Sequence, residues 1–279
     1  MHYYIGLPEW RHPQWYATRP ANPLNLYAQH FSTIEGNSSF YALPSADNLA
    51  AWRDSVPAHF RFCFKFPRTI SHDAQLRHCG AELREFLNRL VPLQDRTGLL
   101  WLQMGPQFSA RNLPDLAAFV AQLPADFHYG IEVRHRDFFR KDENSAAFHR
   151  LLAAQGINRV MFDTRTLFAH PAEDEATRDA LRKKPRFPLQ VVATGAYPMV
   201  RFISPMQINL AEQALDQWAA KICQWISEQR TPYVFFHTPD IREAPQLAQR
   251  FADKVAALNP ELQALTLWDA PPEQDTLPL

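Results

Sequence analysis

Glycine is scarce in this sequence, and the motifs that glycine builds are missing. The 279 residues include only 8 glycines, and neither a GxGxxG nor a GxxxxGKS/T phosphate-binding loop occurs. A dinucleotide-binding open sheet normally carries such a loop after its first strand. An open doubly wound sheet is therefore only our second choice of architecture.

Cysteines and long apolar runs are also few. The three cysteines, Cys63, Cys79 and Cys223, show no CxxC spacing, which indicates free thiols in a reducing compartment. The N-terminal MHYYIGLPEW has neither a basic nor an apolar signal region. No apolar run reaches the roughly 18 residues that a membrane helix needs. We expect a soluble cytoplasmic protein with no membrane association.

Neither sign of charge is in excess. Lys+Arg and Asp+Glu are 29 each, so the net charge is +0. A protein that coats long nucleic acid usually has a basic surface, so this balance does not favour one. A local basic pocket for a small anion or a nucleic-acid end stays open. The 46% of hydrophobic residues suffice for a large core, and no pattern sets the oligomeric state.

Eight short apolar segments alternate with helical patterns along the chain. We predict strands at 3–6, 33–36, 60–66, 99–104, 129–133, 159–163, 199–203 and 233–236. Apolar residues three or four apart predict helices at 25–30, 45–52, 74–91, 113–123, 145–155, 215–225 and 244–258. The stretch 164–198 is a long polar segment. Alternation favours a parallel sheet, and eight units favour a single-domain (β/α)8 TIM barrel at 1–270 with a loose tail at 271–279.

Polar side chains stand at the C-terminal ends of these strands. They are Glu35, Lys65, Gln103, Glu132, Arg134, Asp163, Arg201 and His237. Active sites of α/β barrels lie at this end, and the side chains that face inward would meet at the barrel mouth. We predict the site there, and the clearest segment is HYGIEVRHRDFF at 128–139, where a buried strand runs into charged residues.

The basic members of this set indicate an anion site. Lys65, Arg134 and Arg201 have the charge, and arginine has the bidentate geometry, to bind a phosphate or carboxylate. We therefore expect a small anionic substrate, for example a phosphorylated sugar or nucleotide. The basic run 182–186 (RKKPR) is read as a solvated surface rather than a phosphate site.

The acidic residues and the histidine are the candidate catalytic residues. We expect Glu35 or Glu132 to be the general base, with Asp163 or His237 orienting the substrate or donating a proton. Hydrolysis is the reaction that we favour, although no pattern defines it. Glu35 and Glu132 also suit a glycosidase pair, a role that depends on the distance between their carboxyl groups.

No cofactor is predicted. Glu35, Glu132, Asp163 and His237 offer an alternative oxygen-rich site for a divalent metal, with His72, His78 and His135 as further ligands. Each of those three histidines is more often a surface residue. Lys65 could form a Schiff base only with a lowered pKa, and we expect the nearby carboxylates to raise the pKa of its ammonium instead.

Two classes other than an enzyme stay open. A non-catalytic module could bind a phosphate or a nucleic-acid end with charge complementarity alone, whereas an enzyme needs a carboxylate or histidine with a pKa near neutrality. A structural barrel would pair every charge at its mouth and leave no cavity of ligand size. Aromatic residues after the first two strands could stack on a base or pack over the barrel rim; they are Trp10, Trp15, Phe40 and Tyr41.

Six motifs, in order along residues 4–240, resemble those of the YecE-like family of proteins of unknown function. They are GLPEWRHPQW, FSTIEGNSSFYALP, FRFCFKFPRTISH, LQMGPQF, YGIEVRHRDFF and FFHTPD. The resemblance implies a TIM barrel. It also implies that eleven residues occupy family motif positions: Gly6, Trp10, Glu35, Asn37, Tyr41, Lys65, Gln103, Glu132, Arg134, His135 and Arg201. Four of these, Trp10, Asn37, Tyr41 and Gln103, join the three basic residues as candidate substrate-binding residues.

This chain departs from the family at the end of the last strand. The family usually has two asparagines there, and this chain has His237 and Thr238, which puts His237 in doubt as part of a mechanism common to the family. The barrel is also similar to endonuclease IV-like and xylose isomerase-like enzymes, but by fold alone, which transfers no reaction.

Overall fold

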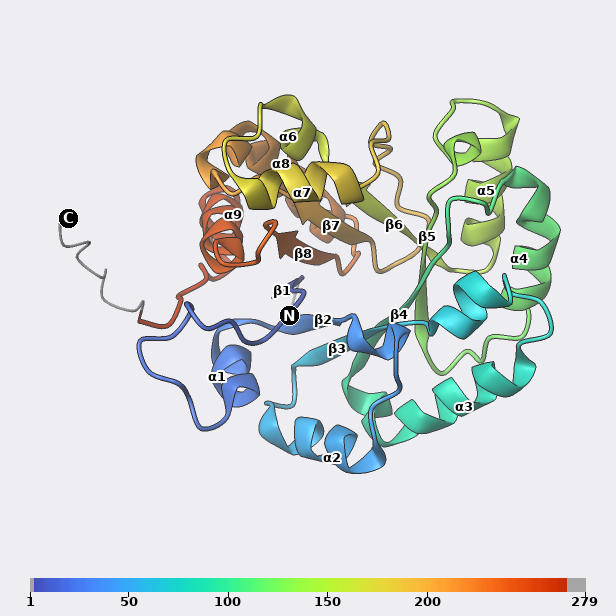
Figure 1. Ribbon diagram of the computed structural model, residues 1–279, viewed down its shortest axis with the longest axis horizontal. Coiled ribbons are helices and arrows are strands. Elements are labelled where there is room, and N and C mark those ends of the chain that lie inside the picture. Colours follow the sequence, from blue (N-terminus) through green and yellow to red (C-terminus); the bar gives the residue numbers. More distant parts are fainter. Residues whose placement is uncertain (1–2, 270–279) are drawn as a thin grey trace.

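The computed structural model describes residues 3–269 and contains a closed barrel of eight parallel strands (Figure 1). The strands are β1 Tyr4–Leu7, β2 Thr33–Gly36, β3 Arg61–Lys65, β4 Thr97–Gln103, β5 His128–Glu132, β6 Asn158–Asp163, β7 Met199–Ile203 and β8 Tyr233–His237. Each strand pairs with the next along the chain, and β8 closes on β1 with Phe235 beside Gly6. The predicted TIM barrel is confirmed, while the loose tail predicted at 271–279 lies outside the described residues.

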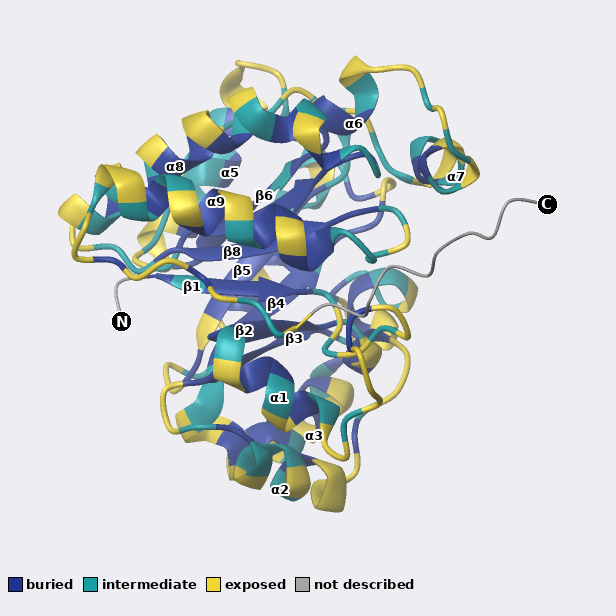
Figure 2. Cartoon of the chain, turned by 90° about the vertical axis from the view of Figure 1, so that its left-hand side faces the viewer, coloured by how far each residue is buried: buried dark blue, intermediate teal, exposed yellow. Residues whose placement is uncertain are grey.

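Helices surround the barrel on its outer side. They are α1 Pro23–His30, α2 Ala46–Ser55, α3 Gly80–Leu90, α4 Leu113–Val120, α5 Glu143–Ala154, α6 Arg165–Ala169, α7 Glu175–Lys183, α8 Glu212–Ser227 and α9 Ala244–Leu258. Figure 2 shows the strands as a buried centre, with helices such as α8 and α9 alternating between buried and exposed residues. Within residues 3–269, no helix is both long enough and apolar enough to cross a membrane.

Two predicted segments differ from the structure. The helix predicted at 74–91 begins only at Gly80, because 69–73 forms a π-helical turn and both Gln75 and Leu76 have positive φ. Leu76 is nevertheless buried, so its apolar character marks a loop in the core. The polar stretch 164–198 contains α6 and α7. Helix α7 was not predicted because only Thr177 and Ala180 of it are buried, so its sequence shows no apolar face.

Inward and outward side chains alternate along each strand, and this positions the site. On β3, Phe62 and Phe64 stack against Trp52 of α2 outside the barrel, so Cys63 and Lys65 point inward. One apolar cluster fills the barrel interior: Cys63, Leu99, Trp101, Val160, Met199, Tyr233 and Phe235. The residues two positions further along these strands form the next layer, at the carboxyl end of the barrel.

Gly6 marks a place where two strands come too close for a side chain. A Cβ at Gly6 would lie 2.2 Å from the carbonyl oxygen of Thr33 on β2. We expect Gly6→Ala to lower the free energy of unfolding by about 1–3 kcal/mol or more, because backbone rather than a flexible side chain must move. Chemical denaturation would measure this loss.

Gly80, the first residue of α3, is the matched control. The nearest atom to a Cβ there is Arg84 Nη1 at 3.5 Å, so Gly80→Ala should leave stability unchanged or raise it by about 0.5–1 kcal/mol. A Gly6→Ala variant as stable as the wild type would contradict the close approach of β1 and β2.

Candidate functional site

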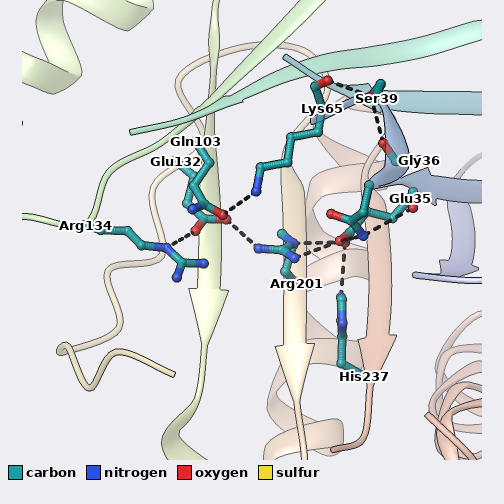
Figure 3. A network of polar contacts seen from close by, with 10 residues as sticks. Glu35, Gly36, Ser39, Lys65, Gln103, Glu132, Arg134, Arg201 and His237 are labelled. Atoms are coloured by element: carbon teal, nitrogen blue, oxygen red, sulfur yellow. Dashed lines mark hydrogen bonds and ion pairs between the residues drawn. The ribbon is translucent and has the colours of Figure 1, made fainter. Parts of the chain in front are cut away.

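A polar layer lies directly above the apolar interior of the barrel. Glu35, Lys65, Gln103, Glu132, Arg201 and His237 each stand two residues beyond an inward-facing position of their strand. Because side chains two apart share a face of a strand, these six turn toward the barrel axis. Figure 3 shows them arranged around Arg201. Of the strand-end residues gathered from the sequence, these six form the layer, while Asp163 does not.

Arg201 of β7 is the centre of the layer. Its Nη2 and Nε donate to Glu35 at 2.7 and 2.9 Å, and its Nη1 donates to Glu132 Oε2 at 2.8 Å. All three side chains are buried. Two carboxylates from β2 and β5 thus share one guanidinium, and removal of that cation would leave Glu35 without its arginine in the interior and Glu132 with Arg134 alone.

Three further side chains complete the hydrogen bonding of the carboxylates. Arg134 Nε donates to the other oxygen of Glu132 at 2.6 Å, and Asn37 Nδ2 donates to Glu35 Oε1 at 2.7 Å. His237 Nε2 lies 3.1 Å from Glu35 Oε2, and it is the donor because an ionised carboxylate only accepts. Every carboxylate oxygen therefore has at least one donor, which is the condition for keeping such charges buried.

Aromatic rings lie against the two guanidinium groups. The guanidinium carbon of Arg201 lies 4.5 Å from the centre of the Trp101 ring and 5.2 Å from that of Phe162. Arg134 lies 4.7 Å from the same Phe162 ring. These cation–π contacts stabilise the arginines and hold their planes in place without using their N–H donors.

The ion pairs determine the protonation of both glutamates. Burial alone would raise the pKa of Glu132, but the Arg134 and Arg201 guanidinium groups outweigh it and lower that pKa to about 2. Burial likewise opposes ionisation of Glu35, yet Arg201 and His237 hold its pKa well below the usual range. Both are therefore weak bases, and this argues against the general-base role that the sequence suggested for them. Their contacts position Arg201.

Lys65 is in a different environment from the carboxylates. Its side chain is 8% exposed, its Nζ donates to Gln103 Oε1 at 3.0 Å, and it lies 3.9 Å from the centre of the Phe40 ring. Among the described residues no carboxylate forms an ion pair with it. Burial, followed by the charge of Arg201, lowers the pKa of Lys65 to about 7. Glu132 and Glu35 do raise this pKa, as expected, but burial and the charges of Arg201 and Arg134 outweigh them, so the expected net rise is wrong.

A pocket of about 490 Å³ opens above this layer. Its polar lining combines strand-end side chains with loop residues: Glu9, Asn37, Tyr41, Lys65, Gln103, Arg134, Lys184, Arg201, His237, Thr238 and Asp240. Glu35 and Glu132 are not among the lining residues, because Arg201 and its neighbours cover them. A ligand in this pocket would therefore meet the cations first.

Lys184 is a lining residue that the sequence did not indicate. It follows the C-terminal end of α7 and was assigned to a solvated surface with the rest of 182–186. That assignment holds for Arg182 and Lys183, which pair with Asp179 on α7. Lys184 instead faces the pocket, where burial and then Arg201 lower the pKa of its ammonium. Only the turn after α7 distinguishes it from its neighbours.

Asp163 does not reach the pocket. Phe162 takes the inward position on β6, so Asp163 points outward and accepts hydrogen bonds from Trp218 Nε1 of α8 at 2.8 Å and Arg165 Nη2 at 2.9 Å. The predicted catalytic role of Asp163 is therefore wrong on geometric grounds. Its contacts tie β6 to the helical layer.

The predicted aromatic residues divide between core and rim. Trp10 packs edge-on against Trp52 of α2 with ring centres 5.2 Å apart, and it does not line the pocket. Its predicted contact with substrate is therefore not supported by the geometry. Trp15 is buried. Tyr41 is 82% exposed at the pocket edge, and Phe40 beneath it faces Lys65.

The residues offered as metal ligands are not brought together. Arg201 occupies the space between Glu35 and Glu132, and Asp163 lies on the other side of the strand. Within residues 3–269 no three His, Cys, Asp or Glu side chains form a group that could hold a metal ion. His135 bonds to Asp137 next to it, and His72 packs against Phe40.

Comparison with known proteins bears out the resemblance carried by the six motifs. The family model described as "Protein of unknown function DUF72" matches residues 4–274. The "UPF0759 protein YecE" of Escherichia coli, in strains K12 and O157:H7, is 43% identical over 274 residues, which cover 98% of this chain and 99% of the relative.

Solved structures carry the same barrel. A DUF72 family protein from Enterococcus faecalis V583 superposes with a TM-score of 0.69 at 15% identity, covering 97% of this chain and 98% of that one. A DUF72 family protein from Thermotoga maritima MSB8 gives a TM-score of 0.62 at 18% identity, covering 90% and 97%. At these identities the likeness concerns the fold.

Proposed function

The chain belongs to the DUF72 family of proteins of unknown function, and from the geometry of its pocket we propose that it is an enzyme acting on a small anionic substrate. The observation that carries this proposal is a ligand-sized pocket in which cations stand above carboxylates that are already neutralised. In such a pocket an incoming anion would pair with Lys65 and Lys184, which form no ion pair within residues 3–269.

Arg134 and Lys184 are the residues that would hold the anion. Arg134 uses Nε for Glu132, and among the described residues its two terminal nitrogens have no hydrogen-bond partner, so they are free to bind a phosphate or carboxylate. Lys184 lines the same pocket and, within residues 3–269, forms no ion pair. Arg201 contributes charge from below while it stays paired with Glu35 and Glu132.

Lys65 distinguishes an enzyme from a module that only binds. A binding site needs cations that stay charged, whereas a pKa of about 7 makes Lys65 half neutral at physiological pH. The lowered pKa of Lys65 weakens its binding of an anion, but it suits a group that transfers a proton or attacks the substrate. A purely structural barrel does not account for the pocket or for a buried lysine held without a carboxylate.

The geometry changes the reaction that we favour. The expected hydrolysis requires a glutamate as the general base, but both glutamates are paired with Arg201 and lie beneath it. Lys65 lines the pocket, and its pKa of about 7 suits a group that gains and loses a proton near neutrality, so we assign proton transfer to Lys65. Burial lowers the pKa of His237, although the neighbouring Glu35 opposes this shift.

Binding of inorganic phosphate tests the anion site. We expect Arg134→Gln and Lys184→Gln each to weaken phosphate binding by roughly 10- to 100-fold, because a hydrogen bond to a charged group contributes roughly 1.5–3 kcal/mol. Isothermal titration calorimetry at low salt would measure the dissociation constants. Lys183→Gln is the matched control, since the ammonium of Lys183 pairs with Asp179 on the outer face of α7.

Equal weakening by the Lys183 and Lys184 variants would contradict the proposed site, because it would indicate unspecific attraction to basic residues. Wild-type protein that binds no phosphate at low salt would also contradict it. Turnover would be screened on small phosphorylated and carboxylated metabolites, with Lys65→Met as the variant that keeps the fold and loses the amine.

A further inference from the structure

We propose that Lys65 is a nucleophile that condenses with the carbonyl group of a small phosphorylated or carboxylated substrate to form a protonated imine. This inference rests on the proposed function, since the same pocket must first hold the anionic group. It narrows the substrate class to anions that also carry an aldehyde or ketone.

The surroundings of the Lys65 amine fit a nucleophile better than a structural ammonium. Its Nζ has one acceptor, Gln103 Oε1 at 3.0 Å, and an aromatic face, Phe40 at 3.9 Å. An ammonium has three hydrogens to donate, so this environment leaves the charged form short of partners. Figure 3 shows the amine reaching from the end of β3 toward Gln103 and the Arg201 network.

The ion-pair network is what keeps Lys65 without a carboxylate. Both oxygens of Glu35 accept from Arg201, and the oxygens of Glu132 accept from Arg201 and Arg134. Two arginines therefore compete with Lys65 for two carboxylates and surround it with positive charge. The lowered pKa of Lys65 agrees with this arrangement and supplies the neutral amine near pH 7.

The pocket also has groups to orient a carbonyl compound. Arg134 and Lys184, which line the same pocket, would bind its phosphate or carboxylate. Gln103 turns Oε1 to Lys65, and its Nε2 has no acceptor among the described residues. That N–H is therefore available to donate to the carbonyl oxygen while the amine attacks the carbon.

The condensation uses no reagent besides the substrate. The lone pair of neutral Nζ forms a C–N bond, and the C=O π electrons move to oxygen, which takes a proton and gives a carbinolamine. The nitrogen lone pair then forms C=N as the C–O bond breaks, and the hydroxyl takes a second proton and leaves as water. From the ammonium form, one substrate carbonyl yields one protonated imine and one water, so charge is conserved.

The imine would activate the carbon next to the former carbonyl. Its positive nitrogen withdraws electrons, so a C–H or C–C bond at the adjacent carbon breaks more readily than in the free carbonyl compound. The chemistry that this site supports is therefore isomerisation or carbon–carbon bond cleavage or formation of an oxo-acid or a keto- or aldo-phosphate.

Reductive trapping tests the inference on the intact protein. The protein is incubated with dihydroxyacetone phosphate in one arm and pyruvate in the other, and each is reduced with sodium borohydride. Mass spectrometry of peptides is expected to locate a secondary amine on Lys65, heavier by the mass of the probe less one oxygen atom. Lys65→Met should lose the adduct, and Lys141→Met, which removes an exposed lysine, should keep it.

The outcomes separate this inference from the proposed function. An adduct on Lys65 in either arm supports it, and the arm that reacts faster identifies phosphate or carboxylate as the anionic group. Phosphate binding without any Lys65 adduct would overturn the nucleophile and leave the anion site standing. Adducts spread evenly over surface lysines would overturn the nucleophile as well. Absence of both phosphate binding and adduct would overturn the two proposals together.

Discussion

Replacement of Arg201 with methionine is expected to lower the free energy of unfolding at pH 7 by roughly 3–5 kcal/mol, the cost of breaking one buried ion pair. The loss should reach the upper end of this range, because one guanidinium serves both Glu35 and Glu132. Since whole domains are stable by roughly 5–15 kcal/mol, this single change would bring the barrel close to unfolding. Chemical denaturation would measure it.

The same substitution should reverse the dependence of stability on pH. In the wild type the pKa values of both glutamates are lowered by folding, so their contribution is complete above pH ~4.5 and is lost as the pH falls toward about 2. Without Arg201 desolvation would raise the pKa of Glu35, while Arg134 and Lys65 would still oppose the same rise at Glu132. The variant should therefore gain stability as the pH falls from neutrality, in the range where the wild type gains none.

A triple variant provides the control. Glu35→Gln and Glu132→Gln, combined with Arg201→Met, remove the stranded charges and should recover much of the stability at pH 7. If Arg201→Met alone were as stable as the wild type at pH 7, the guanidinium would not be compensating buried charge. If the triple variant stayed as unstable as the single one, lost packing would be the cause.

Lys65 is expected to react with trace acetic anhydride at pH 7 roughly 10 to 100 times faster than an ordinary lysine, because its larger neutral fraction outweighs the lower nucleophilicity of a less basic amine. A pKa of about 7 leaves half of Lys65 neutral, whereas a lysine with a pKa of about 10.4 is neutral in less than one molecule in a thousand. Competitive labelling with mass spectrometry, repeated from pH 5 to 11, would give the midpoint for each lysine.

Gln103→Glu tests the cause of this reactivity. A carboxylate in place of the Gln103 amide would lie beside the ammonium and raise its pKa by roughly one to three units, so labelling at pH 7 should fall by roughly 3- to 30-fold. Gln122→Glu adds the same charge at an exposed position and should leave Lys65 unchanged. Labelling of Lys65 at the rate of exposed lysines in the wild type would refute the low pKa.

Stability provides a second readout of Lys65. Its folded pKa of about 7 lies below the ordinary value of about 10.4, so the folded state binds fewer protons than the unfolded state between these values. Stability should therefore rise with pH across that window. Lys65→Met should reduce this rise to the part that Lys184 contributes and be more stable than the wild type at pH 7, the pattern of a residue kept for function at a cost in stability.

Much of the architecture could be predicted from the sequence because it depends on local patterns. Short apolar strands alternate with amphipathic helices, and few arrangements other than a barrel accommodate eight such units. Part of the site followed from the same periodicity. Glu132 and Arg134 are two residues apart and were expected to share a face, and in the structure they form an ion pair.

The remaining features depend on information that strand ends do not contain. At the end of β6 either Phe162 or Asp163 can face the barrel axis, depending on whether the next-to-last or the last residue of the strand points inward. The sequence of β6 is compatible with both choices. Lys184 reaches the pocket only through the turn after α7. The pKa of Lys65 depends on its burial and on the pairing of Glu35 and Glu132 with arginines rather than with Lys65. Both are properties of the assembled barrel.

The shared position of Arg201 between two glutamates also bears on the order in which the chain folds. Its partners lie 166 and 69 residues earlier in the sequence, and His237 contacts Glu35 across 202 residues. Such distant contacts form late because long loops must close first. Until β7 arrives, Glu35 on β2 would lack its arginine, and Glu132 on β5 would have Arg134 alone. The early strands therefore enclose a carboxylate that only β7 neutralises, and closure of the ring is coupled to arrival of the last third of the chain.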